Sequence, residues 1–214
     1  MYLWNDIALI EDDSHFTPWV KEAGRLDHHQ GFLKTLKPFL NGTVVDIGAN
    51  VGTHSIFYSQ FARQLVCFEP NPIAFECLKY NLRNTDANLF QVALSDRHHK
   101  IDLIPQNQNY GANYTVEGST VNAIPLDSIM DLFTSCDFMK IDAEGDELTI
   151  LQGGTTLIQK FKPVICIEIN EHTLSRKGTS GNEVLLYLHS LGYELPKTRR
   201  EGTVCEDFIL RPLL

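Results

Sequence analysis

A glycine-containing loop, residues 46–52 (DIGANVG), is the first stretch whose residue types could bind a ligand. It follows an apolar run, and Gly48 and Gly52 allow a sharp backbone turn and a close ligand approach. The G-x-x-x-G spacing leaves incomplete the G-x-G-x-x-G cradle that binds a pyrophosphate. Asp46 would repel a pyrophosphate but suits a ligand with an ammonium and a sulfonium. S-adenosylmethionine carries both groups.

A second carboxylate, Glu69, ends the apolar run 65–69 (LVCFE). At the carboxyl end of a strand, its two oxygens can accept hydrogen bonds from both hydroxyls of a ribose. Pro70 and Asn71 follow and could frame one side of an adenine, with residues 93–96 (ALSD) on the other side. A ribose site fits NAD equally well, so this part of the sequence leaves both cofactors open.

Three further side chains could act on an acceptor. Asp142 and Glu144 follow the apolar run 137–141 (DFMKI), and His172 follows the run 163–169 (PVICIEI). A hydroxyl acceptor benefits from a general base, and histidine titrates near neutrality. Asp142 and Glu144 also precede an expected helix, where negative charge is favourable for a structural reason alone.

Metal binding is a weaker interpretation of the same region. Asp142, Glu168 and Asn170 could place three oxygen ligands together, as hard cations prefer. Glu168 stands where such an oxygen trio is expected to have an aspartate, so no metal is predicted. The pairs His28-His29 and His98-His99 are interpreted as surface residues, because adjacent side chains do not share a face.

Alternating apolar strands and amphipathic helices predict a parallel sheet covered on both faces. A helix is expected to end at Asn41-Gly42, and Asp127 is expected to cap a short helix. The two strands nearest the C-terminus have no helix between them and should be antiparallel neighbours. The expected strands are 43–47, 65–69, 88–93, 100–104, 120–124, 137–141, 163–169, 193–196 and 205–210, with a polar loop over 106–118. The expected later helices run from 53 to about 62, from 72, over 144–161 and over 182–191.

Six sequence segments, taken in their order along the chain, indicate a particular protein family. They are VVDIGANVGTHS (44–55), FEPNP (68–72), ALSD (93–96), IPLDSI (124–129), FMKIDAEGDELTILQGG (138–154) and the apolar strand with Glu168. Together they resemble the FkbM family of S-adenosylmethionine-dependent methyltransferases over about residues 40–170. The resemblance implies a Rossmann-like class I α/β fold. Its seven-stranded, mostly parallel sheet would have a C-terminal antiparallel hairpin and helices on both faces.

The resemblance also implies a role for each matched residue. The cofactor-binding set is Asp46, Gly48, Asn50, Gly52, Thr53, Glu69, Pro70, Asn71, Ala93 and Leu94. Of these, Asp46, Gly48, Asn50 and Gly52 would line the methionine part, Glu69 would hold the ribose, and Pro70, Asn71, Ala93 and Leu94 would surround the adenine. Lys140, Asp142 and Glu144 would lie at the mouth where the methyl group faces its acceptor, and His172 completes the catalytic candidates.

Bulk properties limit the remaining classes. The 214 residues suffice for one domain, expected to comprise an N-terminal helical segment (1–42), which could act as a lid, and a Rossmann-like core (43–214). The net charge of −9 offers little attraction for nucleic acid, and the basic stretch 197–200 (KTRR) is interpreted as a solvated turn. The five cysteines form no C-x-x-C pair, and no apolar run reaches the ~20 residues of a membrane helix. A cytoplasmic protein without membrane insertion is expected.

The sequence therefore predicts a methyltransferase that uses S-adenosylmethionine to methylate a hydroxyl on a small molecule, a glycan or a natural-product scaffold. Two alternatives stay open at this point: an NAD-dependent oxidoreductase, and a cofactor-binding protein without catalysis. The identity of the acceptor, the methylated atom and the oligomeric state do not follow from the sequence.

Overall fold

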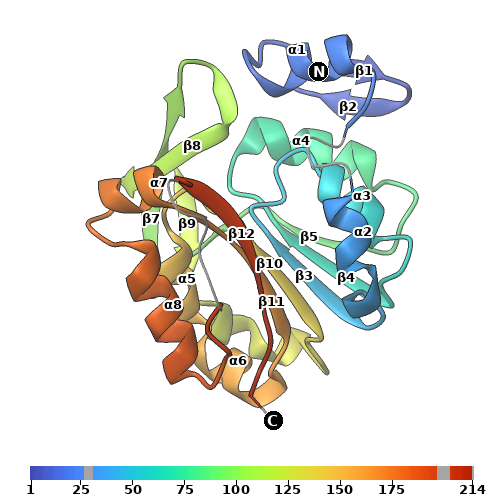
Figure 1. Ribbon diagram of the computed structural model, residues 1–214. Coiled ribbons are helices and arrows are strands. Elements are labelled where there is room, and N and C mark those ends of the chain that lie inside the picture. The colour runs from blue at the N-terminus through green and yellow to red at the C-terminus, as the bar shows by residue number, and fades with distance from the viewer. Residues whose placement is uncertain (27–30, 197–202, 214) are drawn as a thin grey trace.

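A computed structural model describes residues 1–26, 31–196 and 203–213. Its centre is a six-stranded sheet in the order β12-β11-β10-β3-β4-β5 (Figure 1). The parallel strands are β3 (Thr43–Ile47), β4 (Gln64–Phe68), β5 (Asn88–Phe90), β10 (Phe138–Ile141) and β11 (Val164–Asn170). The last strand, β12 (Cys205–Leu210), runs antiparallel to β11. The α/β class and the central strands agree with the sequence prediction.

Helices cover both faces of this sheet. On one face lie α2 (Phe32–Leu36), α3 (Thr53–Tyr58) and α4 (Pro72–Asn81). On the other lie α5 (Glu147–Gly153), α6 (Thr155–Phe161), α7 (Glu171–Arg176) and α8 (Gly181–Ser190). Strand side chains alternate between the two cores: Val45 and Met139 pack under α5, α6 and α8, whereas Val44 and Phe138 pack under α2 and α3. Burial on both faces explains why these strands are continuously apolar.

A separate four-stranded sheet, in the order β6-β9-β7-β8, lies beside the central one. Its strands are β6 (Ala93–Leu94), β7 (His99–Gln106), β8 (Asn109–Glu117) and β9 (Val121–Ile124). The polar loop predicted over 106–118 is therefore wrong, because most of it is β8, paired antiparallel with β7. Asn107 and Gln108 form the turn with positive φ angles of 49° and 60°, as a tight two-residue hairpin requires.

The N-terminal segment is only partly helical. A hairpin of β1 (Tyr2–Trp4) and β2 (Ile7–Leu9) precedes α1 (Phe16–Ala23). Asn81 on α4 fixes this hairpin: its Oδ1 accepts the Ala8 N–H at 2.6 Å, and its Nδ2 donates to the Ala8 carbonyl at 2.9 Å. The helix expected before Asn41-Gly42 is present as α2 and a 3-10 turn, Lys37–Phe39. The pair His28-His29 lies outside the described residues.

Several boundaries differ from the prediction. The seven-stranded sheet has six strands in the described part of the chain, because residues 193–196 make only a bridge from Tyr193 to Pro212. The expected hairpin is thus reduced, and β12 takes β11 as its partner. The predicted strand 88–93 divides between β5 and β6, and the helix over 144–161 divides at Gly154. The helix from residue 53 ends at Tyr58.

Asp127 does not cap the 3-10 helix in which it lies (Leu126–Leu132). Its carboxylate accepts the N–H groups of Thr156 and Leu157 at 2.9 and 2.8 Å, and so caps α6 from outside. This pairing joins segments far apart in the chain, which a local capping pattern cannot reveal.

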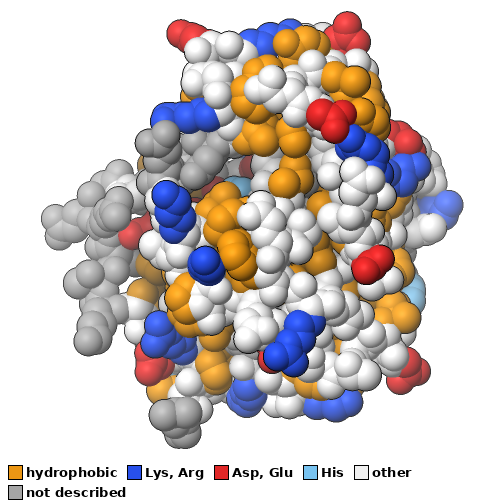
Figure 2. Space-filling view, turned by 90° about the vertical axis from the view of Figure 1, so that its right-hand side faces the viewer, with side chains coloured by type: hydrophobic (Ala, Val, Ile, Leu, Met, Phe, Trp, Pro, Cys, Tyr) orange, Lys and Arg blue, Asp and Glu red, His pale blue; other side chains and the backbone are white. Residues whose placement is uncertain are grey.

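The surface carries charges of both signs. Figure 2 shows one face of the molecule, on which basic and acidic side chains are interspersed among the described residues. The stretch 197–200 lies outside those residues. Within the described ranges, the helices are all too short or too polar to cross a bilayer.

Candidate active site

A cavity of about 220 Å³ lies at the carboxyl ends of the parallel strands, between the two sheets. It gathers the sequence candidates Asp46, Gly48, Asn50, Thr53, Glu69, Pro70, Asn71, Ala93, Leu94, Lys140, Asp142 and Glu144. Two candidates, Gly52 and His172, do not line it. Residues at or just after four strands, β3, β4, β6 and β10, therefore meet at the carboxyl ends of the parallel strands, where this class of fold binds its ligands.

The glycine loop is held by backbone contacts. The N–H groups of Gly48 and Ala49 both donate to the Phe68 carbonyl, at 3.0 and 3.1 Å. Gly48 has a φ of 79°, and a Cβ there would lie 1.8 Å from the Asp142 carbonyl oxygen, so only glycine lets these segments touch. Gly52, with a φ of 87°, turns the chain into α3 and packs against Leu78. Its role is therefore conformational, outside the cavity wall.

Asp46 lies buried at the cavity lining, with its side chain on the α3 face of the sheet. The Ser55 hydroxyl donates to Asp46 Oδ2 at 2.5 Å, which fixes the carboxylate. Burial raises the pKa of Asp46 to about 6, although the Ser55 hydrogen bond and Lys140 oppose that rise. A cationic ligand nearby would stabilise the charged form of such a buried carboxylate.

Glu69 is also buried, and both of its oxygens are oriented by backbone donors. Oε2 accepts the Asn50 N–H and Oε1 accepts the Asn71 N–H, each at 2.7 Å. Burial raises the pKa of Glu69 to about 7, against the effect of these two hydrogen bonds. Each oxygen keeps accepting capacity for a further donor. The residues present thus fit a ligand with two neighbouring hydroxyls, such as a ribose.

The segment after Glu69 is fixed by helix capping. Asn71 Oδ1 accepts the N–H of Ile73 at 2.9 Å, and Pro72 occupies the first position of α4. Proline lacks the N–H that would have no partner there. Pro70 and Asn71 consequently form a rigid edge of the cavity, which Ala93 and Leu94 of β6 also line.

Lys140 is almost fully buried and is surrounded by carboxylates. Its Nζ lies 2.9 Å from Asp207 Oδ1 and 3.4 Å from Asp142 Oδ2. Burial alone would lower the pKa of Lys140, but Asp142 and Asp207, with Cys166, hold it well above its usual range. Lys140 therefore stays charged, which suits it to position Asp142 rather than to accept a proton.

Three carboxylates meet beside Lys140. Oxygens of Asp142, Glu144 and Glu168 all lie within 4.8 Å of one another, and among the described residues they form the group that could hold a metal ion. Burial, followed by Asp142, raises the pKa of Glu144 to about 8. The Asp142 charge, followed by burial, raises that of Glu168 to about 8. Asn170, the third residue of the oxygen trio considered from the sequence, uses its Oδ1 to accept the His172 N–H at 3.1 Å and so caps α7.

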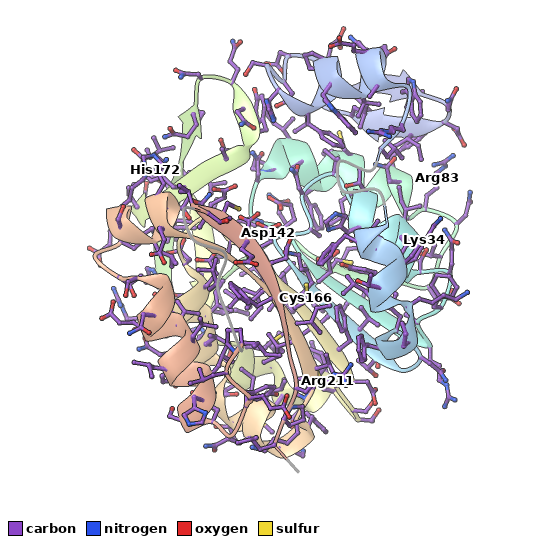
Figure 3. All side chains as sticks on the ribbon, in the orientation of Figure 1. Lys34, Arg83, Asp142, Cys166, His172 and Arg211 are labelled. Atoms are coloured by element: carbon purple, nitrogen blue, oxygen red, sulfur yellow. The ribbon has the colours of Figure 1, made fainter. Side chains whose placement is uncertain are left out.

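Glu144 and His172 differ sharply in placement. Glu144 is half-buried at the cavity, and its φ of 54° is unusual for a residue other than glycine. His172 is exposed on α7, and Figure 3 shows it at the side of the molecule, away from the central Asp142. The structure therefore brings Glu144, and not His172, to the candidate reaction centre.

The second sheet supplies a wall from the stretch that the sequence interpreted as a polar loop. Tyr110, Gly111, Asn113 and Thr115 of β8 line the cavity, with Leu103 of β7. The alternation of Gly111, Asn113 and Thr115 is the signal in the sequence that could have indicated a strand with one face on the site.

A polar network fixes the far end of β8. The Thr115 hydroxyl donates to Asp146 Oδ2 at 2.6 Å, and Lys177 Nζ lies 2.7 Å from Asp146 Oδ1. Lys177 also donates to the Thr115 carbonyl at 2.8 Å. The network joins β8 to the loop that carries Asp142 and Glu144, so this side of the cavity is held as one unit.

The fold is α/β and of the Rossmann-like class, with a cavity at the carboxyl ends of its parallel strands. A solved structure with the same fold is a TehB-like methyltransferase from Corynebacterium glutamicum, described as SAM-dependent. It has a TM-score of 0.55 and 13% identity, over 92% of this chain and 95% of that one.

The family described as methyltransferase FkbM domain matches residues 46–195. The chain belongs to this family: it is a methyltransferase, and its cofactor is S-adenosylmethionine. The match sets aside the NAD-dependent oxidoreductase that the ribose site alone left open.

Two curated relatives are similar in sequence. Hexuronic acid methyltransferase AglP of Haloferax volcanii is 29% identical over 172 residues, which cover 77% of this chain and 68% of AglP. 2-O-methyltransferase NoeI of Sinorhizobium fredii is 40% identical over 91 residues, which cover 41% of this chain and 37% of NoeI. The second match thus spans little more than a third of that relative.

Proposed function

We propose that the chain methylates a hydroxyl oxygen of a sugar or glycan. The observation that carries this proposal is the group of Asp142, Glu144 and Glu168, whose oxygens lie within 4.8 Å of one another and of which Asp142 and Glu144 line the cavity. A hydroxyl is a weak nucleophile and gains from a general base beside it. The names of AglP and NoeI, a hexuronic acid methyltransferase and a 2-O-methyltransferase, support an oxygen on a sugar as the acceptor.

The cofactor is assigned to the glycine-loop side of the cavity. Asp46, Gly48, Asn50 and Thr53 would hold the methionine part, and Glu69 the ribose hydroxyls. Pro70, Asn71, Ala93 and Leu94 would enclose the adenine. The bound cofactor supplies an electrophilic methyl group on a sulfonium. The buried Asp46 carboxylate suits that positive charge, and the twin oxygens of Glu69 suit a pair of hydroxyls.

Glu144 is the proposed general base. Its pKa of about 8 lies close to neutrality, where a base is both partly deprotonated and able to take a proton. Asp142 is paired with Lys140 and is assigned to orienting the acceptor. A base of this kind typically increases the rate ~10²–10⁴-fold. Holding the reactants in line can lower the activation barrier by ~7–11 kcal/mol.

The domain organisation, the class of acceptor and the cellular location are also proposals. Residues 1–214 form one domain, in which the N-terminal segment acts as a lid, supported by its contacts with the Tyr110 end of β8. The acceptor is a small molecule or glycan rather than nucleic acid, in keeping with the net charge of −9. The five cysteines are unpaired, which supports a reducing, cytoplasmic location.

Calorimetry and an acceptor panel test the function. The demethylated cofactor, S-adenosylhomocysteine, should bind, and NAD should not displace it. Methyl transfer should be detected with hydroxylated sugars, and the methyl group should be located on oxygen by NMR. Cofactor binding without transfer to any sugar would support the non-catalytic alternative, and transfer to nitrogen would contradict the choice of atom.

A further inference from the structure

One cavity-lining side chain on β8 has no partner for its oxygen. Asn113 Oδ1 is fully buried and accepts no hydrogen bond within the described chain. Leaving such an acceptor without a donor costs about 1–3 kcal/mol. Because the side chain lines the cavity, a ligand can supply the donor.

The neighbours of Asn113 on the same strand face locate it along the cavity. Two residues before it, Gly111 lies against the cofactor loop, since a Cβ on Gly111 would be 3.3 Å from Asn50 Nδ2. Two residues after it, Thr115 is bonded to Asp146, in the loop that carries Glu144. Successive residues of a strand rise ~3.3 Å, so Asn113 stands roughly midway between the cofactor loop and the carboxylates.

That midpoint is where the methyl group and its acceptor must meet if the cofactor is oriented as proposed above. Thr115 and Gly111 have their contacts within the protein and the Tyr110 hydroxyl donates to Asp12, so Asn113 is the cavity-lining β8 side chain left to bind a ligand. Asn50 Oδ1 is also buried without a partner, but it belongs to the cofactor loop itself.

We propose that Asn113 accepts a hydrogen bond from the hydroxyl next to the one that is methylated, so that the acceptor carries two adjacent hydroxyls. The reactive hydroxyl gives its proton to Glu144 while its neighbour donates to Asn113 Oδ1. Two contacts from opposite walls of the cavity fix both the position and the rotation of a sugar ring. This inference rests on the proposed function and makes Asn113 a residue that determines which hydroxyl reacts.

The test compares Asn113→Leu with the wild type. Leucine has a similar size and removes the accepting oxygen. With a methyl hexopyranoside or methyl hexuronide that the wild type methylates, the KM of Asn113→Leu should rise about 5–10-fold, as for one lost hydrogen bond. The affinity for S-adenosylhomocysteine should stay within about twofold. Asn122→Leu is the matched control, because Asn122 is exposed on β9, outside the cavity, and should change neither value.

A deoxy probe identifies the interacting group. Removing the hydroxyl adjacent to the methylated one should raise the wild-type KM by a factor similar to that of the substitution, but should change the KM of Asn113→Leu by less than about twofold. Asn113→Asp keeps an accepting oxygen and should recover most of the affinity for the intact probe.

Three outcomes overturn the assignment. They are an unchanged KM in Asn113→Leu, equal sensitivity of both proteins to the deoxy probe, and a loss of S-adenosylhomocysteine affinity as large as the rise in KM. The last outcome would make Asn113 a cofactor ligand. Failure of the wild type to methylate any sugar probe contradicts the proposed function itself and is thus distinct from these three.

Discussion

The two sides of the cavity, proposed above as the cofactor side and the acceptor side, are built in different ways. On the cofactor side, the hydrogen bonds join residues close in sequence: Asn71 to Glu69 over 2 positions, Ser55 to Asp46 over 9 and Asn50 to Glu69 over 19. On the acceptor side they span 31 positions from Thr115 to Asp146 and 62 from Lys177 to Thr115. The first side is a local product of two strand ends, and the second is assembled from separate elements.

The difference bears on function. Two neighbouring β-α units are enough to form a cofactor site at their strand ends, so this site does not depend on the structure of more distant elements. The acceptor wall depends on the β7–β8 hairpin, on α7 and on the loop after β10 at once. Changes in any of these elements can therefore alter the acceptor while the cofactor site remains, and variants on the two sides should separate catalysis from cofactor binding.

The largest effect is expected on the acceptor side, from Glu144→Gln. Glutamine keeps the shape but cannot accept the proton, so kcat should fall by ~10²–10⁴-fold. S-adenosylhomocysteine affinity, measured by calorimetry, should stay within about twofold. Glu117→Gln makes the same chemical change at an exposed position on β8 and should retain full activity. A normal kcat in Glu144→Gln would remove this residue from the base role.

The next largest effect is expected on the cofactor side, from Glu69→Ala. Two hydrogen bonds to a charged acceptor are lost, each contributing ~1.5 kcal/mol or more, so S-adenosylhomocysteine should bind about 100-fold more weakly or worse. Glu76→Ala, at an exposed position on α4, serves as the control in the same titration. Circular dichroism of both variants shows whether the fold is retained. An unchanged dissociation constant for Glu69→Ala would contradict the ribose assignment.

The same contrast explains what could be predicted from the sequence. Asp46, Glu69 and the residues around them belong to short motifs at the ends of apolar strands, and all but Gly52 of the cofactor set line the cavity. The central parallel strands were predictable for the same reason, because two-sided burial makes them continuously apolar.

The acceptor wall was not predictable in this way. β8 was expected to be a loop because its polar residues look solvated, although strand pairing with β7 and a cavity on one face account for them. His172 was chosen because it follows a strand and titrates near neutrality, but the chain enters α7 there and leaves it exposed. Long-range pairings such as Asp127 with α6 leave no local pattern in the sequence.

The pH dependence of the reaction tests the acceptor side of the cavity. Glu144 must lose its proton to act as a base, and its pKa is raised to about 8 by burial and by Asp142. The rate should therefore rise about tenfold per pH unit below that value and level off above it. The profile should be absent from the residual activity of Glu144→Gln. A rate that already levels off near pH 5 would show that the essential group has an ordinary carboxyl pKa.

The smallest effect is expected from the contact between the N-terminal segment and β8, which tests whether that segment acts as a lid. Buried Asp13 joins the two: Oδ1 accepts the Tyr110 N–H at 3.1 Å, and Oδ2 accepts the Thr17 N–H at 2.8 Å. Asp13→Ala removes both bonds. If the segment must open for the cofactor to leave, the closed position would lose about 1 kcal/mol of stabilisation. The release of S-adenosylhomocysteine should then be about 3–10-fold faster in stopped-flow measurements.

Asp12→Ala is the matched control for this measurement, because Asp12 is exposed and its carboxylate accepts a hydrogen bond from the Tyr110 hydroxyl at 2.9 Å. It should change the release rate by less than about twofold, because water can replace a hydrogen bond that is exposed to solvent and little free energy is lost. Equal release from Asp13→Ala and the wild type would mean that the cofactor leaves without passing this contact. The N-terminal segment would then stabilise the β7–β8 hairpin only, and the acceptor side would open independently of it.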